Sequence, residues 1–154
     1  MKISDKGLAL MEILEGKKNF IYLDQAGWPT IGVGHLLLAG EKEEFKNGIT
    51  DEKVKELLDR DMDEAERIVN KYVKVEITQA QFDALVIFSF NIGDTGFIFS
   101  TALKLINAKR EMPEIEKWWK AWNKITVEGV KQVSSGLVNR REAEWKLYSQ
   151  GLYS

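Results

Sequence analysis

Residues 19–38, NFIYLDQAGWPTIGVGHLLL, show a pattern that differs from the rest of the chain. The β-prone run 20–23 is followed by the turn-forming run 24–27, and residues 30–35 then alternate glycine with β-branched residues. Short β-prone runs separated by a turn-forming cluster are typical of strands joined by turns. We therefore expect a β-hairpin or small sheet near the N-terminus.

A helical pattern precedes this region. Apolar residues within 4–15 fit one broad face of a helix, with Ser4 or Asp5 as its N-cap and Gly16 as its stop. A helix this short and one-sided must pack on later helices, so its last residue, Glu15, is expected at a junction between the helical part and the β-region.

Two longer helical patterns follow the β-region. Residues 51–72 repeat apolar side chains along one side, behind Thr50 as a cap. Thr78 and Gln81 have the spacing of a capping box ahead of the almost wholly apolar run 82–92. That run predicts a buried central helix.

Shorter helical segments complete an α+β arrangement. They are expected at about residues 101–109, 113–124 and 137–150. We expect one domain over 1–154, with a β-rich lobe over about 17–50 and a helical lobe formed by about 51–154 together with 4–15.

Composition excludes several classes of function. The chain has 154 residues, 44% of them hydrophobic, no cysteine, one histidine and a net charge of −2. A thiolate or multi-histidine metal site is therefore excluded, and nucleic acid is not expected as a partner. We expect no metal and no cofactor.

The chain has no apolar run long enough to span a membrane, so no membrane partner is expected. Its first residues are too polar for a secretory signal. We expect the protein to begin in the cytoplasm.

Carboxyl groups are then the natural source of chemistry. Glu15 ends the first helix, Asp24 follows after eight residues and Thr30 after five more, so three polar groups border one small β-region. Cleavage of a glycosidic bond needs a proton donor and a second group that activates water. A carboxyl shielded from water keeps its proton more readily than one in a polar turn, which favours Glu15 as the acid and Asp24 as the anion.

The same residues resemble the signature of phage lysozymes of glycoside hydrolase family 24, in which Glu, eight residues, Asp, five residues and Thr form the catalytic pattern. Residues 81–85 with 90–93 resemble that family's central helix, and residues 136–144 resemble its C-terminal motif. The resemblance thus covers nearly the whole chain in the right order. It implies a lysozyme-like fold, with the active-site cleft between a small β-region and a helical lobe.

The resemblance implies that Glu15 is the proton donor, Asp24 the second carboxylate, and Thr30 a residue that helps to hold the attacking water. It also implies that Leu36 and Phe90 line the substrate cleft. The substrate is then bacterial peptidoglycan, cut within the glycan strand at the β-1,4 bond between N-acetylmuramic acid and N-acetylglucosamine. We expect a monomer that inverts the anomeric configuration. The resemblance also implies a protein of the host cytoplasm that reaches the cell wall by a separate release route.

Two further polar residues are expected to have supporting roles. A lone histidine cannot form a metal site, so His35 is interpreted as structural, with Asp61 as its partner and a raised pKa as the consequence. The resemblance favours Arg140 beside Glu15, orienting it.

Among the tryptophans, Trp118 and Trp122 are one helical turn apart and are expected to share a core-facing side. Trp28, in the turn beside Asp24, is the one expected to be exposed near the cleft.

Two alternatives to an enzyme are open. A binding module of the same fold would bind glycan strands without cutting them. A replaced Glu or Asp would have indicated such a module, but both expected carboxyl residues are present. A helical interaction protein would show a large exposed apolar face, whereas the apolar periodicity here is accounted for by one core.

Overall fold

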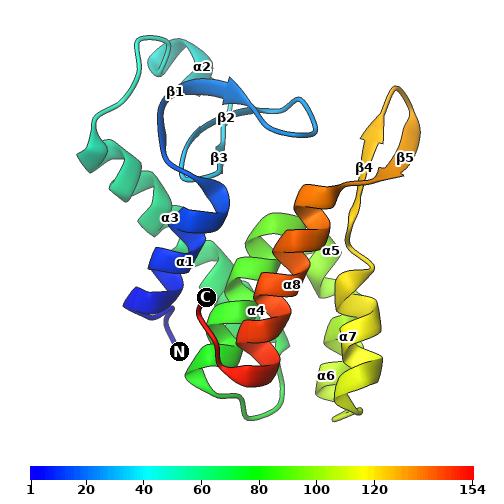
Figure 1. The fold of residues 1–154 in the computed structure, drawn as a ribbon. Helices are drawn as coiled ribbons and strands as arrows, with labels where there is room; N and C mark the ends of the chain where they lie inside the picture. Colours follow the sequence, from blue (N-terminus) through cyan, green and yellow to red (C-terminus); the bar gives the residue numbers. More distant parts are fainter.

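The computed structural model describes residues 1–154, a mainly helical chain with two small antiparallel sheets (Figure 1). The helices are α1 (Asp5–Glu15), α2 (Glu41–Glu44), α3 (Asp51–Tyr72), α4 (Gln79–Ile92), α5 (Asp94–Ile98), α6 (Thr101–Asn107), α7 (Met112–Lys120) and α8 (Ser135–Gln150). The strands are β1 (Lys18–Leu23), β2 (Pro29–Gly32), β3 (His35–Leu36), β4 (Lys124–Val127) and β5 (Val130–Val133). This combination confirms the predicted α+β class.

Helix α1 leads from the helical part of the molecule into the first sheet (Figure 1). The Ser4 hydroxyl accepts a hydrogen bond from the N–H of Gly7 and caps the first turn. Gly16, at φ 74°, ends the helix in a conformation that favours glycine. The predicted helix is confirmed, and Glu15 is its last residue.

The predicted β-region is a three-stranded sheet with the order β1-β2-β3. Thr30 on the middle strand lies opposite both Tyr22 on β1 and Leu36 on β3. Ile31 is buried beneath the sheet with Phe45 and Leu57, the latter from α3. This small core holds the sheet against α3.

Helix α4 lies at the centre of the helical part and packs against α8, α3 and α1. Its start has the predicted capping box, in which the Thr78 and Gln81 side chains each accept from the other residue's backbone N–H. Eight consecutive residues, from Phe82 to Ser89, are buried in it. The predicted central helix is confirmed, and it supports both α1 and α8 beside the cleft described below.

The second sheet corrects one prediction. The helix expected over 113–124 ends at Lys120, and β4 and β5 then form an exposed hairpin. Both turn residues, Glu128 and Gly129, have positive φ (50° and 79°), as two-residue hairpin turns with the right twist require. The signal was present in the sequence, since β-branched residues flank this Glu-Gly pair.

The prediction that Trp118 and Trp122 face the core is wrong. Trp119 is the fully buried tryptophan of α7, where it stacks on Phe88 at 4.4 Å between ring centroids. Trp118 and Trp122 are 41% and 37% exposed. The core-facing side of α7 is set by Ile115, which is buried one turn before Trp119.

Candidate active site

A cleft of about 570 Å³ separates the first sheet from α8 and β4, within the size range of small-ligand sites. Its walls come from the end of α1, from β1 and the turn after it, from the end of α4, and from the starts of β4 and α8. Glu15, Asp24 and Arg140 all line it. The structure thus brings together three of the residues singled out in the sequence.

Glu15 is held between a backbone and a cation. On one side its carboxyl packs against Gly34, where a Cβ atom would lie only 2.7 Å from Glu15 Oε2. On the other side Glu15 Oε1 accepts from Arg140 Nη1 at 2.5 Å. The expected contact between Glu15 and Arg140 is therefore present. The glycine at position 34 is required both for its φ of 66° and for this close approach.

Asp24 lies in the turn between β1 and β2 and shapes that turn. Its Oδ1 accepts from the backbone N–H groups of Ala26 at 2.9 Å and Trp28 at 2.8 Å. Its Oδ2 makes no hydrogen bond with the protein and is free for a solvent molecule or ligand. The next residue, Gln25, accepts from the Ser134 hydroxyl at 2.8 Å, which ties this turn to the start of α8.

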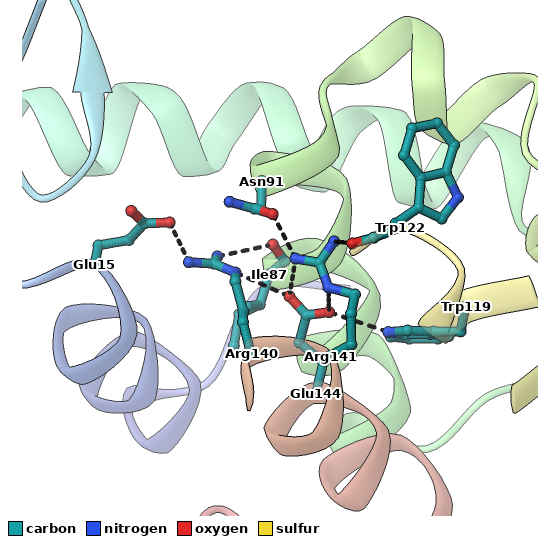
Figure 2. Close-up of polar contacts among 8 residues, drawn as sticks. All are labelled: Glu15, Ile87, Asn91, Trp119, Trp122, Arg140, Arg141 and Glu144. Atoms are coloured by element: carbon teal, nitrogen blue, oxygen red, sulfur yellow. Dashed lines mark hydrogen bonds and ion pairs between the residues drawn. The ribbon is translucent and has the colours of Figure 1, made fainter. Parts of the chain in front are cut away.

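Beyond Glu15, charged groups form a buried network on α8 (Figure 2). Arg140 donates to Glu144 Oε2 at 3.0 Å and to the carbonyl of Ile87 at 3.4 Å. Arg141 donates to Glu144 Oε2 at 3.0 Å and to Asn91 Oδ1. Burial lowers the pKa of Arg141, and the charge of Glu144 opposes that effect. The network connects Glu15 at the cleft to the interior of the helical part.

Three expected site residues do not line this cleft. Thr30 is buried, and its hydroxyl donates to the carbonyl of Trp28 at 2.8 Å. Leu36 is exposed on β3, the strand on the other side of β2 from the cleft-lining β1. Phe90 packs against the main core, while its neighbours Asn91 and Ile92 line the cleft. Trp28 is exposed, as expected, but is not part of the lining either.

Sequence reasoning missed Tyr22 as a site residue, although it belongs to the motif quoted above. Burial raises the pKa of its phenol, and the nearby charges of Glu15 and Asp24 raise it further. Tyr22 therefore lies close to both carboxyl groups. A signal existed, because Tyr22 lies only two residues before Asp24 in the sequence.

The cleft is more basic than the chain as a whole. The net charge of the protein is −2. The lining nevertheless holds more cationic than anionic side chains: Lys18, Lys124, Arg140 and Arg141 against Glu15 and Asp24. A local excess of positive charge favours approach of an anionic ligand even when the net charge is negative.

His35 supports the sheet next to this site. Its Nδ1 lies 2.7 Å from Asp61 Oδ2, which confirms the expected partner, and its Nε2 lies 2.8 Å from Glu41 Oε1. Only the imidazolium form can donate from both nitrogens. The hydrogen bond to Asp61 raises the pKa of His35 above its ordinary value, burial opposes this, and Glu41 raises it further. Glu41, in the short helix α2, was not predicted as a partner of His35.

No group of three or more histidine, aspartate or glutamate side chains is arranged to hold a metal ion. None of the helices combines the length and the apolar character needed to cross a bilayer. The carboxyl groups that line the cleft can donate a proton and activate water.

Comparisons with known proteins agree with this geometry. The family model described as phage lysozyme matches residues 12–144. The chain is 35% identical to the endolysin of Acyrthosiphon pisum secondary endosymbiont phage 1 over 148 residues, which cover 96% of this chain and 98% of the relative.

Solved structures show the same relationship. The endolysin from Escherichia coli O157:H7 phage FAHEc1 superposes with a TM-score of 0.86 at 38% identity, covering 100% of this chain and 97% of the other. The muramidase domain of SpmX from Asticaccaulis excentricus gives a TM-score of 0.83 at 33% identity, covering 97% and 98%. The fold is thus that of the lysozymes, as the motif resemblance implied.

Proposed function

The chain belongs to the phage lysozyme family and is a lysozyme that hydrolyses peptidoglycan, and we propose that Glu15 is its general acid. In this proposal Asp24 is the second carboxyl group. The bond cut is the β-1,4 linkage between N-acetylmuramic acid and N-acetylglucosamine, within the glycan strand. The observation that carries the proposal is that Glu15 and Asp24 line the same cleft, with Arg140 bound to Glu15.

In the proposed reaction one carboxyl group donates a proton and the other takes one. Glu15 donates its proton to the glycosidic oxygen as the bond from that oxygen to the anomeric carbon breaks. Asp24 takes a proton from a water molecule whose oxygen bonds to the anomeric carbon from the opposite face. This route inverts the anomeric configuration. Proton exchange with solvent then returns both carboxyl groups to their starting states.

Arg140 and Thr30 support this reaction in different ways. Once Glu15 has given up its proton, the adjacent Arg140 guanidinium stabilises the carboxylate that is left. The Thr30 hydroxyl donates to the Trp28 carbonyl, and the Trp28 N–H donates to Asp24 Oδ1. Because Thr30 is buried outside the cleft lining, we propose that it helps to orient the attacking water indirectly, by holding the turn that carries Asp24.

The test of Glu15 is a comparison of two substitutions on one helix. Glu15→Gln retains the shape of the side chain but cannot supply the proton, so clearing of a cell-wall suspension should fall by at least about a hundredfold. Glu12→Gln, at an exposed position on the same helix, should clear at the wild-type rate. Substantial clearing by a folded Glu15→Gln protein would remove Glu15 from this role.

Inversion has its own test. The first product released from a soluble glycan strand should carry the α-configuration at the new reducing end. NMR can detect this anomer before mutarotation equalises the two anomers. A β-anomer would instead indicate a covalent intermediate on Asp24. A wild-type protein that binds cell walls without releasing any reducing ends would favour the non-catalytic binding module.

A further inference from the structure

Glu144 is a charged side chain that the proposed reaction does not use. It lies on α8 with no exposed surface. Removing a carboxylate from water is costly unless cations and hydrogen bonds compensate. Its Oε1 accepts from Trp119 Nε1 at 3.0 Å, and its Oε2 accepts from Arg140 Nε and Arg141 Nη2, each at 3.0 Å. Arg141 Nε also lies 2.9 Å from Glu144 Oε1, where it forms an ion pair but no hydrogen bond.

These contacts fix the orientation of the Arg140 guanidinium. Glu144 follows Arg140 by four residues on α8, so both side chains lie on the same face of the helix. The Arg140 Nε and Nη2 groups face Glu144 and the Ile87 carbonyl, which leaves Nη1 directed at Glu15. Figure 2 shows Arg140 lying between the two glutamates, with Arg141 and Trp119 on the far side of Glu144.

We propose that Glu144 is a positioning residue for the reaction, holding Arg140 so that its Nη1 meets the carboxyl group of Glu15. The inference rests on the proposed role of Glu15 as the acid. Glu144 itself touches no substrate, since it is fully buried and is not part of the cleft lining.

Glu144 also controls how much positive charge Glu15 experiences. The titratable and charged groups that face Glu15 are Tyr22 from β1 and Arg140 from α8, with Arg141 within electrostatic range. Helix α4 contributes only the neutral groups of Ile87 and Asn91 to the network. Glu144 neutralises part of the charge of the two arginines. Without it, the undivided positive charge would favour the ionised form of the facing carboxyl.

A matched control exists in Asp83, the other fully buried carboxylate with several donors. It accepts from the Ser4 N–H, Gln79 Nε2 and the Tyr153 hydroxyl, and has no arginine partner. A substitution there disturbs a buried carboxylate to a similar degree but leaves Arg140 and Glu15 in place.

The experiment compares Glu144→Gln with Asp83→Asn in steady-state hydrolysis of soluble glycan strands, below the unfolding temperature of either variant. Glu144→Gln should lower kcat by about tenfold to a hundredfold, as expected for a misplaced reacting group, with KM within about twofold. The alkaline limb of its pH profile for kcat should move to lower pH. Asp83→Asn should lose stability while keeping the wild-type kcat and pH profile.

A double-mutant cycle tests whether Glu144 acts through Arg140. In an Arg140→Met background, Glu144→Gln should change kcat by less than about twofold, since the positioned group is gone. Independent, multiplicative losses would overturn the proposal. So would a folded Glu144→Gln protein with the wild-type kcat and pH profile.

A charge-conserving variant covers the case in which Glu144→Gln does not fold. Glu144→Asp retains the negative charge but is one methylene too short to keep its present contacts with Arg140. It should lower kcat several-fold while leaving the alkaline limb near its wild-type position, and a wild-type kcat would contradict the proposal. Failure of the acid role itself is recognised separately, because Glu15→Gln would then be active.

Discussion

Asp83 and Glu144 both lie fully out of water, yet the groups that donate to them differ. Asp83 is surrounded by neutral donors from residues 4, 79 and 153, which join both ends of the chain to the start of α4. Glu144 is bound by two arginines and Trp119, and one of those arginines reaches the cleft. We call the donors around Asp83 the neutral shell and those around Glu144 the cationic shell. The difference indicates that the neutral shell holds chain segments together, whereas the cationic shell can also affect the charge around Glu15 and the orientation of the arginine beside it.

The largest effect is expected at the cationic shell. Arg141→Met should leave Glu144 with one cation and lower the free energy of unfolding by about 3–5 kcal/mol, since breaking a buried pair leaves an uncompensated charge. Urea unfolding monitored by circular dichroism measures this change.

The control for that prediction is the same substitution at an exposed ion pair. Arg67→Met removes the contact with Glu64 on the surface of α3 and should cost far less, because water screens an exposed ion pair. Equal losses at the two positions would mean that burial of the Glu144 network has no energetic consequence.

A second prediction disturbs the cleft end of the network. Gly34→Ala places a Cβ atom 2.7 Å from Glu15 Oε2 at a φ of 66°, so it should push Glu15 away from Arg140. We expect about 2 kcal/mol of lost stability and a loss of kcat of at least about tenfold. Gly129→Ala has a similar φ of 79° with open space around it, and it isolates the backbone cost. If both variants keep full activity, the close packing on Glu15 is unimportant.

The sequence predicted the helix ends well because each depends on a local signal. Ser4, Thr50 and Thr78 cap α1, α3 and α4 through their own side chains, and Gly16 and Gly93 end α1 and α4. The hairpin of β4 and β5 carried an equally local signal but lay next to a helical pattern that was extended too far.

The site was predictable only where a motif or a single partner defined it. The motif located Glu15, Asp24 and Arg140 in one cleft, and the partner of His35 was expected on the helix that follows it. The role of Glu144 could not be predicted, because it depends on Trp119 meeting the face of α8 that carries Glu144 and on Glu15 meeting Arg140. Both are properties of packing between segments far apart in the sequence.

A third buried cluster, around His35, differs from both because its cation titrates in the ordinary pH range. The pKa of His35 is raised, chiefly by Asp61. The stabilisation that protonated His35 provides is therefore complete below its ordinary pKa of 6.5. It is lost as pH rises through the raised pKa. For Glu41, burial acts to raise the pKa, but hydrogen bonds from Leu38 and His35 lower it overall. The contribution of Glu41 is lost as pH falls through that lowered value. Both groups are charged between these limits.

His35→Asn should therefore cost about 1–2 kcal/mol at about pH 6, and less as pH rises beyond the raised pKa of His35. Urea unfolding of both proteins across this range measures the difference. Arg141→Met should show no such decline, because arginine does not titrate there. A cost at His35 that is constant with pH would show that the side chain contributes by packing alone.

The smallest effect is expected at the neutral shell. Tyr153→Phe removes one of the donors to Asp83, a hydroxyl at 2.6 Å from Oδ2, while the Ser4 hydroxyl still donates to that oxygen. Because the site is near the chain end and the other donors stay in place, the loss should be about 1 kcal/mol at neutral pH. Tyr72→Phe is the matched control, since the Tyr72 hydroxyl donates to no protein group and its loss should be close to zero. A loss at Tyr153 as large as that at Arg141 would contradict the distinction between the two shells, because one neutral donor among several would then matter as much as a buried cation.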